Sequence, residues 1–165
     1  MLRVATEDDV ETIRRWRNHP RTRDASIFRA EITPQMHSEW WTRRSADPTY
    51  HILIFSYRDR PCGVVLFQDH DADARTSEWG FFLDVDGLTE RNELLPAWME
   101  MEKEAVAYGF EELKLTSMGG RTLAWNASVL ALHKRFGFQQ VPEKGYTTEI
   151  NGKDEAVVWT ELRQP

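Results

Sequence analysis

The chain has 165 residues and a formal net charge of −6 at neutral pH. This length suits one domain with a sizeable core, over residues 1–165. The negative charge argues against a general nucleic-acid binder, and a single cysteine excludes an internal disulfide or a cysteine zinc cluster. No apolar run reaches membrane-spanning length and the N-terminus has no secretory signal, so we expect a cytoplasmic protein without a membrane segment.

The first third of the chain is predicted to hold one short strand and two helices. Residues 1–5 form the strand, and Thr6 then starts a capping-box-like sequence before apolar positions at helical spacing. The first helix ends at His19-Pro20, because the residue before a proline disfavours helical geometry. Thr33-Pro34 opens the second helix, since proline is favoured at the first helical position.

The middle of the chain is predicted to form three consecutive strands. Residues 51–57 and 62–68 are β-prone apolar runs that indicate a hairpin, with Cys62 as a buried small apolar residue. Residues 69–73 are rich in Asp but lack a further ligand at definite spacing, which favours a solvated turn over a metal site. The third strand covers residues 77–84, and Gly80 inside it predicts a bulge or a close backbone approach.

The last part of the chain is predicted to alternate helix and strand. A long amphipathic helix covers about residues 92–109, a strand follows at 112–117, and an Asn151-Gly152 turn joins a final hairpin of 146–150 with 155–162. Together with the short helix described next, the order is β-α-α-β-β-β-α-β-α-β-β. This order predicts an α/β fold with a mixed sheet and helices on both faces.

The segment from Trp125 to Phe138 is predicted to be a short amphipathic helix with both ends marked. Asn126 is a favoured N-cap, and Gly137 suits the left-handed residue that closes a helix. Asn126 and His133 are about two turns apart, so both lie nearly on one face and can line a cleft. Alternatively, Asn126 only caps the helix and His133 only lies in its solvated last turn.

The same segment resembles the motif that closes the acyl-coenzyme A site in the GNAT superfamily of N-acetyltransferases. The order of elements is also similar to the GNAT acyl-CoA N-acyltransferase fold over essentially the whole chain. The resemblance implies acetyl-CoA as co-substrate, with Asn126 contacting the coenzyme A arm. It also implies that His133, at a position where the family usually has Tyr, protonates the departing thiolate, for which imidazolium is a competent acid near neutral pH.

Three segments resemble more narrowly the PseH-like acetyltransferases, which acetylate a nucleotide-linked amino sugar: Ile13–Pro20 with Arg23, Met36–Trp41, and Glu78–Phe82. By this resemblance Arg17, Arg23 and His37 contact a diphosphate or sugar hydroxyls, which suits the bidentate geometry of guanidinium. The alternative for Arg17 and Arg23 is that both are exposed charges near a helix end.

Acyl transfer to an amine requires few protein groups. Backbone amides of Phe82, Leu83 and Asp84 are the candidates for polarising the thioester carbonyl. Glu78, on the same strand, is the candidate for receiving the proton of the amine. The alternative for Glu78 is a structural hydrogen bond.

One departure from the family concerns the segment that usually holds the pyrophosphate of coenzyme A on a glycine-rich loop. Here the expected glycine positions fall near Pro96 and Trp98, so Arg91 becomes the candidate phosphate partner. We expect a GNAT-type N-acetyltransferase for a small-molecule amine, without a metal. The alternatives are another amine or a protein N-terminus as acceptor, a different acyl donor, or a non-catalytic binding protein. A homodimer is left open.

Overall fold

The computed structural model describes all 165 residues and confirms a mixed α/β fold. The sheet has eight strands in the order β1-β2-β3-β4-β5-β8-β6, and β7 pairs with β8. The strands are β1 (Leu2–Val4), β2 (His51–Tyr57), β3 (Arg60–Asp71), β4 (Thr76–Leu83), β5 (Ser117–Leu123), β6 (Gln139–Gln140), β7 (Tyr146–Ile150) and β8 (Lys153–Arg163). The helices are α1 (Val10–Arg17), α2 (Pro20–Asp24), α3 (Pro34–Ser45), α4 (Val85–Glu90), α5 (Leu94–Ala107) and α6 (Ala127–Arg135).

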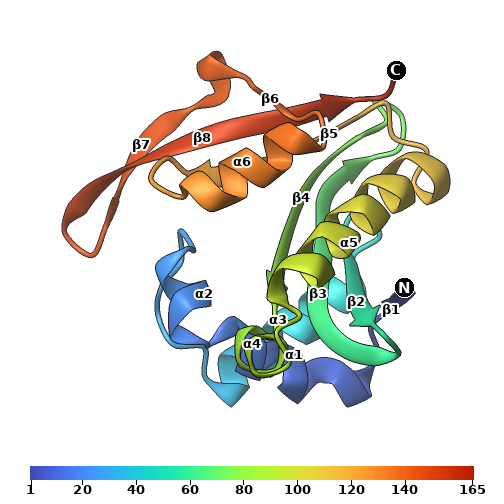
Figure 1. Cartoon of the computed structure of the whole chain (residues 1–165), viewed down its shortest axis with the longest axis vertical. Coiled ribbons are helices and arrows are strands. Elements are labelled where there is room, and N and C mark those ends of the chain that lie inside the picture. Colours follow the sequence, from blue (N-terminus) through green and yellow to red (C-terminus); the bar gives the residue numbers. More distant parts are fainter.

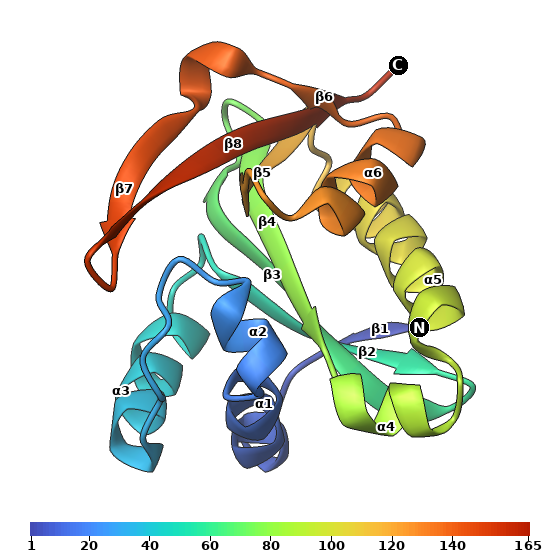
Figure 2. The same ribbon diagram turned by 60° about the vertical axis from the view of Figure 1, so that its left-hand side comes forward.

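Both faces of the first half of the sheet are covered by helices. The core on one face includes Leu53 and Val65 and packs against α5, whereas the core on the other face includes Ile54 and Val64 and packs against α1 and α3. Figures 1 and 2 show α5 on one side of β2–β4 and α1–α3 on the other. Because neighbouring strand residues point to opposite faces, β2 and β3 read as continuous apolar runs rather than alternating ones.

The sheet opens between β4 and β5. Strand β4 pairs antiparallel with β3 up to Leu83, but it pairs parallel with β5 only from Thr76 to Glu78. Beyond this short contact the two strands diverge, and the β5–β8 half swings away from the β1–β4 half (Figure 1). The far end of β4 therefore has one edge without a neighbouring strand.

The strand predicted at 112–117 lies further along the chain in the structure. Helix α5 runs on into a π-helical turn at Tyr108–Glu112, and the strand is β5, from Ser117 to Leu123. The strand contains two glycines, which have a low propensity for strand interiors, so its sequence does not indicate a strand. They are required by close approach, since a Cβ added to Gly119 would lie 2.6 Å from the Trp159 ring, and one on Gly120 would lie 2.7 Å from the Trp79 carbonyl oxygen.

The predicted bulge at Gly80 is wrong. Pairing between β3 and β4 passes through Leu66 and Gly80 without a shift, and the irregularity lies between Gln68 and Asp71. A Cβ added to Gly80 would meet no atom within 4 Å. This glycine therefore leaves open space beside β4 rather than relieving crowding.

Turn and cap signals were the most reliable local predictions. The capping box of Thr6 with Asp9 is present, and the Thr33 hydroxyl accepts a hydrogen bond from the Met36 amide at 3.2 Å. Asn151 and Gly152 both have positive φ, as the tight hairpin turn requires.

Helices α2 and α4 were not predicted. Pro20 stops α1 and also occupies the first turn of α2. The Asp84 carboxylate caps α4 by accepting a hydrogen bond from the Gly87 amide at 3.2 Å. None of the helices combines the length and the apolar character that a membrane-spanning helix requires.

Candidate active site

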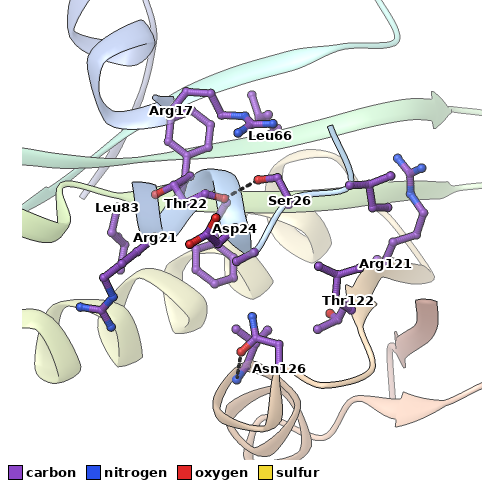
Figure 3. A pocket seen from close by; sticks show the side chains of 18 of the residues that line it. Arg17, Arg21, Thr22, Asp24, Ser26, Leu66, Leu83, Arg121, Thr122 and Asn126 are labelled. Carbon is purple, nitrogen blue, oxygen red and sulfur yellow. Dashed lines mark hydrogen bonds between the residues drawn. The ribbon is translucent and has the colours of Figure 1, made fainter. Parts of the chain in front are cut away.

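A cavity of about 810 Å³ lies in the opening between β4 and β5. Figure 3 shows part of its lining, with Arg17 and Arg21 on one side and Arg121, Thr122 and Asn126 on the other. We call one part of the lining, from β4, α5, α6 and the residue that caps α6, the transfer wall: Trp79, Phe81, Leu83, Trp98, Asn126 and His133. We call the part from α1, α2 and the loop after α2 the arginine wall: Arg17, Arg21, Thr22, Asp24, Ser26 and Phe28.

His133 is buried in the transfer wall. Its residue surface is 5% exposed, and its ring centroid lies 5.3 Å from those of Trp79 and Phe138. Its Nδ1 lies 2.6 Å from Oε1 of Glu102, whereas Nε2 makes no hydrogen bond within the protein and is not fully buried. The alternative of a solvated last-turn residue is therefore wrong. His133 lines the cavity with one ring nitrogen already engaged.

Asn126 combines both interpretations of the sequence. Its side-chain oxygen accepts a long hydrogen bond of 3.5 Å from the Val129 amide at the first turn of α6 (Figure 3), and the residue also lines the cavity. Gly137 has a φ of 94°, which is the left-handed conformation expected after α6. These two residues fix the ends of the helix that carries His133.

Only one of the three predicted amide donors faces the opening. The Asp84 amide donates to the Cys62 carbonyl at 2.8 Å, so it points to β3, whereas the Trp79 carbonyl points towards Gly120 on the β5 side. Because strand amides alternate between edges, the Phe82 amide also points to β3. The Leu83 amide faces the opening, and so does that of Phe81, which sequence reasoning missed because it does not show which edge of a strand is free.

Glu78 lies where β4 and β5 last pair. Its Oε1 accepts a hydrogen bond from Nε of Arg121 at 2.6 Å, and both side chains line the cavity. Glu78 therefore makes a structural hydrogen bond and also lines the cavity. Arg121 was missed, since no signal in the sequence distinguishes it from other arginines.

The three predicted acceptor residues are not brought together. Arg17 lines the cavity, where its Nη2 donates to the Phe28 carbonyl at 2.9 Å and its Nη1 is buried without a partner. Burial lowers the pKa of the Arg17 guanidinium, and the positive charge of Arg23 lowers it further. Arg23 itself lies outside the cavity lining and donates to the Arg29 carbonyl at 2.9 Å.

The prediction that His37 contacts the acceptor does not match its position. His37 is 4% exposed, stacks on Trp40 with ring centroids 4.9 Å apart, and packs in the layer of α1 and α3. Its helical face is turned to α1 rather than to the opening. Arg21 takes a place in the lining that the sequence did not assign to it.

The start of α5 lacks a glycine loop for phosphate. Pro96 lies in the first turn and has no amide hydrogen. Nε of Arg91 donates to Glu93 at 2.9 Å, and Nη1 of Arg58 donates to the same carboxylate at 3.0 Å. None of these charged side chains lines the cavity. The residues present fit the acyl end of a coenzyme A thioester better than they fit its pyrophosphate.

The chain matches the family model described as acetyltransferase (GNAT) domain over residues 1–139. It therefore belongs to this family of acetyltransferase enzymes. A search of curated proteins finds no significant match.

Several solved structures share the fold. A spermidine N-acetyltransferase from Vibrio cholerae, in complex with CoA and spermine, has a TM-score of 0.80 at 17% identity over 99% of this chain and 95% of that one. A putative phosphinothricin N-acetyltransferase has a TM-score of 0.76 at 16% identity over 100% and 98%. The N-acetyltransferase PseH from Campylobacter jejuni, in complex with acetyl coenzyme A, has a TM-score of 0.68 at 15% identity over the full length of both chains. At these identities the similarity concerns the fold alone.

Proposed function

We propose that this protein is an acetyl-CoA-dependent N-acetyltransferase whose acceptor is the amine of an anionic small molecule, of the class of nucleotide-linked amino sugars. The observation that carries the acceptor class is Arg17, which lines the cavity and whose Nη1 has no hydrogen-bond partner within the protein. A buried donor of this kind is stabilised by an anionic oxygen, and guanidinium pairs well with phosphate.

The charge of the cavity supports the same class. Its lining has three arginines, Arg17, Arg21 and Arg121, against the two carboxylates of Asp24 and Glu78. Because Glu78 already pairs with Arg121, most of the remaining charge is positive. A polyamine carries several positive charges, which the arginine wall would repel, whereas a diphosphate would be attracted.

The donor is proposed to lie along the free edge of β4. Amides of Phe81 and Leu83 are directed into the opening, where they can polarise a thioester carbonyl. Gly80 leaves space beside the strand, and Asn126, the residue that caps α6, lines the same cavity. Two of the similar structures contain CoA or acetyl coenzyme A, which supports this donor for the fold. An acetyl-CoA donor also agrees with a cytoplasmic location, which stays a proposal.

The chemistry needs one bond formed, one bond broken and two protons transferred, one from the nitrogen and one to the sulfur. The amine nitrogen forms the bond to the carbonyl carbon as the carbon–sulfur bond breaks. The nitrogen loses a proton, for which Glu78 at the end of the opening is the proposed acceptor, directly or through water. The sulfur gains a proton, which His133 donates from Nε2. Acetyl-CoA supplies the acyl group, and the protein supplies position, amides and proton transfer.

A second candidate follows from the start of α5. That segment has Pro96 and the Arg91–Glu93 pair in place of a glycine loop, so the second candidate is a protein that uses a different acyl donor or binds no donor at all. Calorimetric titration with coenzyme A separates these options. We expect micromolar binding; no detectable binding would favour a non-catalytic protein that binds a ligand in the same cavity.

The acceptor is tested with a panel of amines and acetyl-CoA, following free thiol. The panel contains a nucleotide-linked amino sugar, the free amino sugar, spermidine and a peptide with a free N-terminus, and mass spectrometry identifies each product. Cys62 adds little background, because burial raises its pKa to about 11. We expect the nucleotide-linked sugar to react faster than spermidine. The opposite order would overturn the acceptor class, and no thiol with any amine would contradict the enzyme activity.

A further inference from the structure

A buried carboxylate contacts the ring of His133. Glu102 lies on α5, is 0% exposed, and places Oε1 2.6 Å from Nδ1 of His133 on α6. Its second oxygen, Oε2, is also buried and has no hydrogen-bond partner. The two residues are 31 positions apart in the sequence, so their contact exists only through the packing of α5 beside α6. His133 is therefore the sole side-chain partner of Glu102.

We expect the Glu102–His133 pair to contribute little to the stability of the fold. Removing a carboxylate from water is expensive, and a buried ion pair is often replaceable by apolar residues of similar volume without loss of stability. The surroundings would suit such residues, since the rings of Trp79, Phe81 and Phe138 all pack around His133. A half-satisfied carboxylate in this apolar setting, directed at a residue that lines the cavity, points to a role in chemistry.

We propose that Glu102 is a positioning residue that keeps the proton of His133 on Nδ1 and its Nε2 directed at the cavity. This inference rests on the proposed acetyl transfer. An ionised carboxylate can only accept a hydrogen bond, so the 2.6 Å contact is made when Nδ1 carries a hydrogen. The orientation of the ring then follows from the place of Glu102 on α5.

The consequence is that only Nε2 exchanges a proton with the reaction. When Nε2 donates its proton to the sulfur, the ring becomes neutral and keeps its Nδ1 hydrogen on Glu102. The lone pair left on Nε2 then faces the cavity, where it takes up a proton from water before the next turnover. Without the carboxylate, the neutral ring can hold its hydrogen on either nitrogen and can rotate, so a part of the population presents the wrong atom.

The test compares Glu102→Gln with Glu100→Gln, a matched substitution at an exposed position of the same helix. Loss of the partner that orients a metal-bound imidazole lowers activity by about 10- to 100-fold, and we use the same scale for the ring of His133. We expect a fall of this size in kcat for Glu102→Gln, with KM for acetyl-CoA unchanged within about twofold, as for an interaction used only in the transition state. Glu100→Gln should behave as wild type.

The double variant Glu102→Gln with His133→Phe provides the readout that a merely structural role would not give. If Glu102 acts through His133, adding Glu102→Gln to His133→Phe causes no further loss of kcat. Losses that multiply, or a wild-type kcat in Glu102→Gln, would overturn the proposal. If wild-type protein releases no thiol at all, the proposed function fails instead, and the two failures are thus distinguishable.

A measurement on the wild-type protein covers the case in which Glu102→Gln does not fold. The ¹⁵N chemical shifts of the His133 ring report which nitrogen carries hydrogen, without any turnover. We expect the Nδ1 shift to be that of a nitrogen that carries hydrogen, as its contact with Glu102 requires. A neutral ring with its hydrogen on Nε2 would overturn the role of Glu102.

Discussion

The two walls of the cavity are built in different ways. The transfer wall is held by buried aromatic packing, and within it Glu102 contacts the ring of His133. The arginine wall is held by hydrogen bonds from side chains to the carbonyls of a loop, as from Arg17 to Phe28, and it keeps an unpartnered charged donor. A rigid wall suits a reaction whose donor and geometry do not vary, whereas a loop suits recognition of a particular acceptor.

The largest effect is expected for a substitution in the transfer wall. His133→Phe keeps the ring volume but removes the proton donor, so we expect kcat to fall by about 100-fold or more, as for loss of a general acid. Steady-state kinetics measure this loss, and calorimetry should find little change in coenzyme A affinity. Lys134→Ala, at the exposed next position, is the control. Lost coenzyme A binding with turnover per bound complex preserved would refute the acid role.

The matching change in the arginine wall should act on the acceptor instead. Arg17→Ala removes a charged hydrogen-bond donor, which is worth roughly 10- to 100-fold in affinity, so KM for the acceptor should rise by that factor. KM for acetyl-CoA should stay the same, and Arg15→Ala, which changes an exposed arginine of the same helix, should have no effect. An equal rise in KM for both substrates would mean that the two walls are not separate in function.

Two glycine substitutions sharpen the comparison through stability. Gly120→Ala places a Cβ 2.7 Å from the Trp79 carbonyl oxygen, and overpacking of this kind typically lowers stability by about 1–3 kcal/mol. Gly80→Ala meets no atom within 4 Å and should fold as wild type. Thermal denaturation compares the two. An unaltered melting temperature for Gly120→Ala would show that β4 and β5 do not need glycine where they diverge.

The smallest expected effect is at the start of α5. Arg91 is partly exposed and already forms an ion pair with Glu93. We therefore expect Arg91→Ala to weaken coenzyme A binding by less than about tenfold, within the range of surface ion pairs. Calorimetry measures the change. An identical dissociation constant would remove Arg91 from the donor site and leave the pyrophosphate to other groups.

The sequence was informative where a feature is local and failed where it depends on a neighbouring strand or helix. The helix start at Thr33-Pro34 and the cap at Asn126 follow from short-range effects, and both were predicted correctly. Strand β5 was misplaced, because Gly119 and Gly120 make sense only beside Trp159 and Trp79.

The same limit applies to the site. Asn126 and His133 could be assigned to one helical face from their spacing alone, and both line the cavity. Arg21 and Arg121 could not be found, since nothing local separates them from exposed charges. Glu102 was overlooked, although its spacing from Trp98 and Ala105 places it on the buried face of α5. His37 was assigned to the acceptor by resemblance alone, and the structure buries it away from the cavity lining.

A structure with coenzyme A bound tests the central assignment most directly. We expect the thiol-bearing arm to run along the free edge of β4, in contact with the amides of Phe81 and Leu83, with the sulfur within hydrogen-bond reach of Nε2 of His133. Coenzyme A bound away from this opening, or a sulfur out of reach of His133, would contradict the account.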